Sequence, residues 1–157
     1  TSVPTTENLY GVAYSTKGVW VAAGTNGTLL SSADGSTWTT QASGTTASLK
    51  SVSAIASTTN SVTTYTIVAA GTNGTLLTST DYGVTWTAQT LGTADLNAVF
   101  ASTRFVAVGS GGAIYTSDDA ITWTPRTSPA STSMYGLIHA NNIYTAVGAG
   151  SSSIYSY

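Results

Sequence analysis

The stretch AAGTNGTLLTSTDYGVTWT, residues 69–87, contains the signals that decide the fold. It opens with an apolar run ending in Gly71, passes through the turn dipeptide Asn73-Gly74 into a second apolar run, and reaches Trp86. Short runs of apolar and β-branched residues between turn dipeptides are typical of β-strands. Asn-Gly favours a type I′ hairpin, because both central residues need a positive φ. We therefore expect antiparallel strands joined by tight turns.

Similar stretches elsewhere show that the chain is a tandem repeat. Residues 22–39 are nearly identical to residues 69–87, and residues 107–124 follow the same pattern. The units open with LYGVAYS at Leu9, LKSVSAI at Leu49, LNAVFAS at Leu96 and MYGLIHA at Met134, which are 40, 47 and 38 residues apart. The long second unit contains an insertion at residues 58–64. Four short strands in about 40 residues are typical of a propeller blade.

We therefore predict an all-β fold, a small β-propeller of four blades in one domain spanning residues 1–157. The fourth unit lacks the Trp-containing segment, and residues 1–6 resemble the missing outer strand. That strand closes the ring of its own chain or completes the blade of a neighbouring chain, and the sequence leaves both open. The expected parts are a closing strand at 1–8, blade 1 at 9–48, blade 2 at 49–95, blade 3 at 96–133 and an incomplete blade 4 at 134–157.

The segment from Ser79 to Trp86 has the pattern SxDxGxTW, which resembles the Asp-box, or BNR, repeat of bacterial propellers. The resemblance implies that the aspartate accepts turn N–H groups and that the tryptophan fills the space between neighbouring sheets. The residues expected in these structural roles are Asp34, Trp38, Asp81, Gly83, Trp86, Asp118 and Trp123. The repeat is also similar to secreted bacterial propellers and to photosystem II assembly-factor propellers. Such repeats occur in proteins of many functions, so the resemblance indicates the fold alone.

The residue inventory argues against catalysis. Asp-box repeats occur in sialidases, and resemblance to that class would require three arginines around the sugar carboxylate. This chain has only Arg104, Arg126 and a single glutamate, Glu7. It has no cysteine, and His139 is its only histidine, so we expect no metal site and no cofactor. We expect His139 to lie near the propeller channel, bonded to a backbone carbonyl.

The repeat also singles out candidate binding residues. Equivalent positions on the innermost strands of a propeller surround its axis. The second position of that strand holds Tyr10, Lys50, Asn97 and Tyr135, which are aromatic or polar. We predict that these four residues, together with His139, surround one mouth of the propeller and bind a glycan or a peptide there.

Composition limits the partners. Charged residues make up 6% of the chain, against roughly 25% in typical proteins, and the net charge is −2. With four basic residues the chain cannot form a basic stripe, so we expect no nucleic-acid partner. No apolar run approaches the roughly 18 residues of a membrane helix, so we expect no membrane insertion.

The expected function follows from these features. The chain begins at Thr1 rather than Met, which is consistent with removal of a signal peptide or with a trimmed chain. We expect an extracellular, secreted and non-catalytic propeller with a structural or adhesive role. It would assemble with itself by N-terminal strand donation into a fibre or matrix. The alternative is a lectin-like module that binds glycans or proteins at the propeller mouth.

Overall fold

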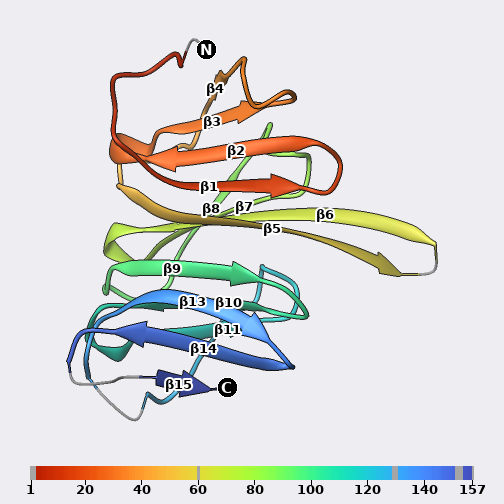
Figure 1. The fold of residues 1–157 in the computed structure, drawn as a ribbon. Coiled ribbons are helices and arrows are strands. Elements are labelled where there is room, and N and C mark those ends of the chain that lie inside the picture. The colour runs from red at the N-terminus through yellow and green to blue at the C-terminus, as the bar shows by residue number, and fades with distance from the viewer. Residues whose placement is uncertain (1–2, 60, 129–130, 151–153, 157) are drawn as a thin grey trace.

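The computed structural model describes residues 3–59, 61–128, 131–150 and 154–156. Their strands form four antiparallel sheets, one for each sequence repeat, and we call each sheet a blade (Figure 1). Within each blade the strands follow one another in sequence order, so every pair is joined by a direct connection. The expected all-β fold is confirmed.

The strand bounds follow the repeat. Blade 1 contains β1 (Leu9–Ser15), β2 (Val19–Gly24), β3 (Leu29–Ser32) and β4 (Thr39–Gln41). Blade 2 contains β5 (Leu49–Thr59), β6 (Val62–Gly71), β7 (Thr75–Ser79) and β8 (Thr87–Thr90). Blade 3 contains β9 (Leu96–Ala101), β10 (Phe105–Gly109), β11 (Ile114–Ser117) and β12 (Thr124–Pro125). Blade 4 contains β13 (Met134–Ala140), β14 (Ile143–Gly148) and β15 (Ile154–Ser156).

Single 3-10 turns join the second and third strands of the first three blades: η1 (Thr25–Gly27), η2 (Thr72–Gly74) and η3 (Ser110–Gly112). Asn26 and Asn73 have φ values of 52° and 56°, and the glycine after each also has a positive φ. The N–H of Thr28 closes the first turn onto the carbonyl of Thr25 at 2.9 Å. The positive φ expected at both Asn-Gly pairs is thus confirmed. No helix in the described residues has the length and apolarity needed to cross a membrane.

The glycine that ends each second strand is required by a close backbone approach. At Gly24 the φ of −160° is ordinary extended backbone, yet an added Cβ would collide with the carbonyl oxygen of Asn8. The chain entering the blade crosses at that point, and the N–H of Thr25 donates to the same carbonyl at 2.9 Å. The crossing recurs in blade 3, where Gly109 meets the carbonyl of Asp95. The repeated glycine therefore ties the start of each blade to its second strand.

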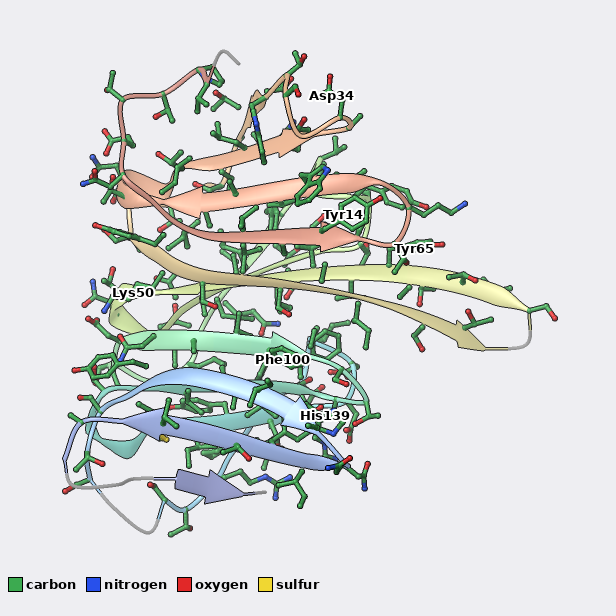
Figure 2. The ribbon with its side chains drawn as sticks, viewed as in Figure 1. Tyr14, Asp34, Lys50, Tyr65, Phe100 and His139 are labelled. Atoms are coloured by element: carbon green, nitrogen blue, oxygen red, sulfur yellow. The ribbon has the colours of Figure 1, made fainter. Side chains whose placement is uncertain are left out.

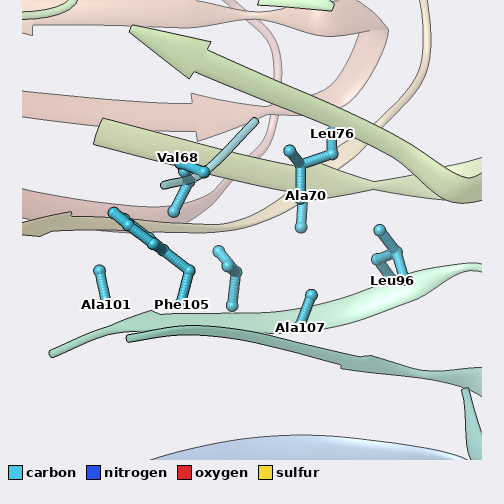
Figure 3. Close-up of a cluster of buried hydrophobic side chains, with 9 residues drawn as sticks. Val68, Ala70, Leu76, Leu96, Ala101, Phe105 and Ala107 are labelled. Atoms are coloured by element: carbon cyan, nitrogen blue, oxygen red, sulfur yellow. The ribbon is translucent and has the colours of Figure 1, made fainter. Parts of the chain in front are cut away.

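The core lies between the blades. Each of the three blade–blade interfaces is filled by apolar side chains from both sheets, and Figure 3 shows the interface between blades 2 and 3. Blades 2 and 3 bury both faces of their sheets in this way. The principal pairs of facing groups are Val21 and Leu29 with Ile67 and Leu77, Val68 and Leu76 with Leu96 and Phe105, and Val106 and Ile114 with Met134 and Tyr144.

The four blades form an open arc, with the N-terminus beside blade 1 and the C-terminus beside blade 4 (Figure 1). Residues 3–8 form no strand, and the Glu7 carboxylate accepts hydrogen bonds from the side chains of Thr25 and Asn26. These contacts hold the segment on blade 1. Residues 3–8 therefore do not pair with blade 4 to close the ring. Residues 1–2 of the expected closing strand lie outside the described residues. Donation of that strand to a neighbouring chain stays a prediction.

The insertion in the second repeat lengthens one hairpin. β5 and β6 project beyond the other blades, as Figure 1 shows. Near the base of the projection Tyr65 packs against Tyr82, with ring centroids 5.2 Å apart. The ammonium of Lys17 lies 5.9 Å from the centroid of Tyr65, so blade 1 also contacts the hairpin.

Candidate binding site at the mouth of the arc

The four predicted mouth residues occupy the same irregularity in each blade. In β1 the pairing with β2 shifts between Leu9 and Gly11, so Tyr10 is an extra residue in the ladder. The same shift leaves Lys50, Asn97 and Tyr135 as the extra residues of β5, β9 and β13. A β-bulge bends the strand and re-aims its side chain. The bulges therefore present one residue from each blade at the same end of the arc.

These residues share a cavity. Tyr10, Lys50, Asn97 and Tyr135 line a space of about 420 Å³ together with Ser48 and Thr72. A larger space of about 560 Å³ follows the concave side of the arc along β1, β5, β9 and β13. The two tyrosines are more than half exposed, at 55% and 61%. We call the four residues the mouth ring.

A hydrogen-bond network fixes the polar half of the mouth ring. The Lys50 ammonium donates to Asp95 Oδ2 and to Asn97 Oδ1, each at 2.9 Å. Asn97 Nδ2 donates to the Met134 carbonyl at 2.9 Å, which links blades 3 and 4. The Lys50 hydrogen bond and the N–H of Asn73 hold the pKa of Asp95 below its ordinary value. Because an ammonium has three donors, Lys50 keeps one for a ligand.

Serine hydroxyls fix the innermost strands against each other. Ser51 Oγ accepts the N–H of Val99 at 3.1 Å, and Ser53 Oγ accepts the N–H of Ala101 at 3.0 Å. These bonds join β5 to β9 between two sheets that share no ladder. The concave wall of the cavity is therefore set before any ligand binds, which lowers the ordering cost of binding.

His139 is not part of the mouth ring, and that prediction is wrong. It lies on the same strand as Tyr135 but four residues further, about 13 Å at strand spacing. Figure 2 shows Lys50 and His139 at opposite ends of the inner strands. His139 Nδ1 lies 2.9 Å from Ser102 Oγ, and its ring lies 4.2 Å from that of Tyr144. The expected backbone carbonyl partner is thus replaced by a hydroxyl between blades 3 and 4.

The Asp-box residues lie at the outer side of the blades, in turns away from the mouth ring. Asp34 Oδ1 accepts the N–H groups of Thr37 and Ser36, each at 2.7 Å, which lowers the pKa of Asp34 to about 2. Asp81 accepts the N–H of Thr85 at 2.9 Å and its hydroxyl at 2.6 Å. The carboxylates are occupied by the turns they close.

The third Asp-box uses Asp119, so the prediction of Asp118 is wrong. Asp119 Oδ1 accepts the N–H groups of Thr122 and Ile121 at 2.7 and 2.8 Å, and these bonds lower its pKa to about 2. Asp118 Oδ1 instead accepts hydrogen bonds from Arg104 Nε and Nη2, at 2.9 and 2.8 Å. The spacing Ser-x-Asp, which places the aspartate two residues after the serine, identifies the turn aspartate in all three segments.

The three tryptophans of the Asp-box segments differ in what they contact. Trp86 packs on the interface between blades 1 and 2 and donates Nε1 to the Gly83 carbonyl at 3.0 Å. Gly83 itself is buried with a φ of +82°. Trp123 packs on the next interface, with its ring 6.4 Å from that of Phe105. Trp38 lines a groove on the open side of blade 1.

No metal site is visible in the described part of the chain. Those residues contain no group of three or more histidine, cysteine, aspartate and glutamate side chains that could hold an ion. The side chains of the mouth ring offer two phenol rings, an amide and an ammonium for stacking and hydrogen bonding.

No protein-family model matches the sequence, and no curated protein matches it either. Solved structures do resemble the fold. YCF48 from Cyanidioschyzon merolae matches 99% of this chain with a TM-score of 0.68 and 21% identity. YCF48 bound to D1 peptide matches with a TM-score of 0.69 and 21% identity. A β-fructofuranosidase from Schwanniomyces occidentalis, complexed with fructosyl-erythritol, matches 92% of this chain with a TM-score of 0.53 and 13% identity.

The chain spans little more than half of YCF48, covering 57% and 56% of the two YCF48 chains and 41% of the β-fructofuranosidase chain. At these identities the likeness concerns the fold. The chain has a propeller-type fold.

Proposed function

We propose that the chain is a non-catalytic propeller module that binds an extended peptide of a partner protein at its mouth. The observation that carries the proposal is the mouth ring: four equivalent β-bulges aim Tyr10, Lys50, Asn97 and Tyr135 at one cavity. Aromatic side chains with a polar tip are enriched at protein interfaces. The two tyrosines are the anchors in this proposal, and Lys50 with Asn97 supplies hydrogen bonds to the peptide backbone or a carboxylate.

Two further observations support a peptide. The larger cavity runs along the inner strands of all four blades, which suits an elongated ligand. YCF48, which has the same fold type, has been solved bound to D1 peptide. The carboxylate of Asp95 is already engaged by Lys50 and Asn73, so it is a poor general acid or base. That engagement favours binding over catalysis.

The test is selection of peptides on the immobilised chain from a random peptide library, followed by affinity measurement in solution. Tyr10→Ser with Tyr135→Ser should weaken binding of the selected peptides at least tenfold. Tyr82→Ser is the matched control, because Tyr82 is an exposed tyrosine outside the mouth ring. Equal binding of the selected peptides to the double variant and to the Tyr82→Ser control would exclude the mouth ring as the binding site. Failure to select any peptide, with ring-dependent binding to a glycan array, would favour the lectin-like alternative.

The structural or adhesive role, acting outside the cell, is the second candidate. Its supporting observation is apolar surface on the two end blades, where Val12 is 61% and Ile138 is 58% exposed. If copies join by donating the N-terminal strand, a chain lacking residues 1–6 should no longer assemble. Electron microscopy of the purified chain would show fibres or separate particles.

A further inference from the structure

Each blade has two faces, and the interfaces define them. We call leading the face that packs against the preceding blade in blades 2, 3 and 4. We call trailing the face that packs against the following blade in blades 1, 2 and 3. The arc therefore ends with two faces that lack a neighbour in the described structure: the leading face of blade 1 and the trailing face of blade 4 (Figure 1).

The leading face of blade 1 has the composition of a buried face. Leu9 is 41% exposed, whereas the residues at its position in the other blades, Leu49, Leu96 and Met134, are 0% exposed. Trp20 is 37% exposed, although its counterpart Ile67 is completely buried. Val3, Leu9, Val12 and Trp38 line an apolar groove of about 340 Å³ on this face.

The trailing face of blade 4 shows the same contrast. Val147 is 49% exposed, whereas its counterparts Val108, Ala70 and Ala23 are 0% exposed. Ile138 and Ile143 extend this apolar surface, at 58% and 46% exposed. Residues 127–157 contain no aspartate, glutamate, lysine or arginine. Depletion of charge is the mark of an interface core.

We propose that the leading face of blade 1 binds the trailing face of blade 4 in a second copy of this chain. A leading face meets a trailing face three times within the arc, so the two free faces are the two halves of one established interface type. Every copy carries one of each, which makes the contact head-to-tail rather than symmetric. The proposal does not rest on peptide binding at the mouth ring, although Tyr10 lines both the groove of the leading face and the mouth cavity.

The number of sheets is compatible with closure. Closed propellers typically contain about four to eight blades, and two copies of the described arc contain eight sheets. Two head-to-tail contacts would then close a ring with no free face. If the rotation between copies does not close, the same contact generates a filament.

The experiment uses two blocking variants of the full chain. Val12→Asp places a charge on the leading face, and Val147→Asp places one on the trailing face. Burying either unpaired carboxylate in the contact is costly. Val62→Asp is the matched control, because Val62 is 63% exposed on the projecting hairpin. Thermal melts establish that each variant is folded.

Sedimentation velocity should show dimers or longer assemblies for the parent chain and for Val62→Asp. Each blocked variant alone should be a monomer. A mixture of the two should form a heterodimer, because the trailing face of Val12→Asp and the leading face of Val147→Asp remain intact. The mixture should need a higher protein concentration than the parent chain to associate, because the heterodimer has one interface whereas a closed parent dimer has two.

Three results would overturn the inference. The first is a parent chain that stays monomeric at the highest soluble concentration. The second is a blocked variant that still dimerises alone, which would mean a symmetric contact. The third is a mixture of folded blocked variants that remains monomeric.

Discussion

Blade 1 and blade 2 share a nearly identical stretch, residues 22–39 and 69–87, in two different surroundings. Ile67 on the leading face of blade 2 is completely buried against blade 1, whereas Trp20 at the same position of blade 1 is 37% exposed. The outer face of blade 1 carries leucine, valine and tryptophan, the residue types that fill the interfaces between the other blades. Burial of a residue in this fold therefore depends on whether a neighbouring blade covers it. The residues at these positions are apolar in both blades, whether or not a neighbour is present.

The largest expected effect compares Phe105 with Trp20, which occupy equivalent positions in blades 3 and 1. Phe105 is 6% exposed and packs within the interface between blades 2 and 3. Phe105→Ala should lower the free energy of unfolding by about 3–5 kcal/mol. Trp20→Ala should cost less, about 1 kcal/mol, because Trp20 packs within its own blade, with its ring 4.6 Å from that of Tyr14, and has no facing blade in the described structure. Urea unfolding at low protein concentration measures both.

Protein concentration sharpens this comparison. If copies associate through the leading face of blade 1, Trp20→Ala should become more destabilising as concentration rises, because binding stabilises the folded state by mass action. Phe105→Ala should show the same loss at every concentration. Equal losses for the two variants at low concentration would show that the end face is covered within the chain itself.

The two Asp-box tryptophans give a smaller version of the same contrast. Trp86 packs on buried residues of blades 1 and 2 and bonds to Gly83. Trp86→Ala should cost about 2–3 kcal/mol, below the range for fully buried aromatics because the ring is half-buried. Trp38→Ala should cost about 1 kcal/mol, since Trp38 lines an open groove. Denaturant midpoints that fall equally would contradict the difference between the two faces.

Much of the fold could be predicted from periodic positions in the sequence. The repeated starts at Leu9, Leu49, Leu96 and Met134 begin the first strand of each blade, and the Asn-Gly pairs form the turns that they predict. Openness of the arc could not be predicted, because the pattern within one blade is the same whether or not a neighbour covers it. The contacts that hold Glu7 on blade 1 depend on Thr25 and Asn26, which the sequence indicated only as part of a turn.

The candidate site was predictable to a similar degree. Equivalence of position was enough to group Tyr10 and Tyr135, but the β-bulge that aims them has no signature in residue type. His139 lies away from the mouth ring because it stands four residues beyond Tyr135 on the same strand, although both belong to an innermost strand. The spacing of Asp81 from Trp86 predicts Asp118 in blade 3, but the turn of blade 3 is one residue shorter and uses Asp119. Local hydrogen bonding, rather than pattern, decides between two adjacent carboxylates.

Acid should destabilise the end blade and an interior blade alike, because the Asp-box turns are local. The pKa values of Asp34 and Asp119 are about 2 in the folded chain, below the ordinary value near 3.8. A lowered folded pKa means that the contribution to stability is complete above about pH 4 and disappears as the pH falls toward 2. The melting temperature should therefore fall across that window.

Two variants check the assignment of this acid effect. Asp34→Asn and Asp119→Asn together should lower the melting temperature at neutral pH and flatten its dependence between pH 4 and pH 2. Either single variant should remove part of the slope. An unchanged slope in the double variant would assign the acid sensitivity to other carboxylates, with Asp95 as the next candidate because its pKa is also lowered.

The smallest expected effect separates the adjacent residues Asp118 and Asp119. Asp118 is 75% exposed and pairs with Arg104, which is 40% exposed, and exposed pairs contribute about 0–1 kcal/mol. Asp118→Asn should therefore leave the melting temperature almost unchanged, and any loss should vanish at high salt, which screens the pair. Asp119→Asn should lower it more and in a salt-independent way, because short backbone hydrogen bonds in the turn weaken. The reverse order would mean that Asp118 closes the turn of blade 3, as its distance from Trp123 predicts, and that the Ser-x-Asp spacing does not identify the turn residue.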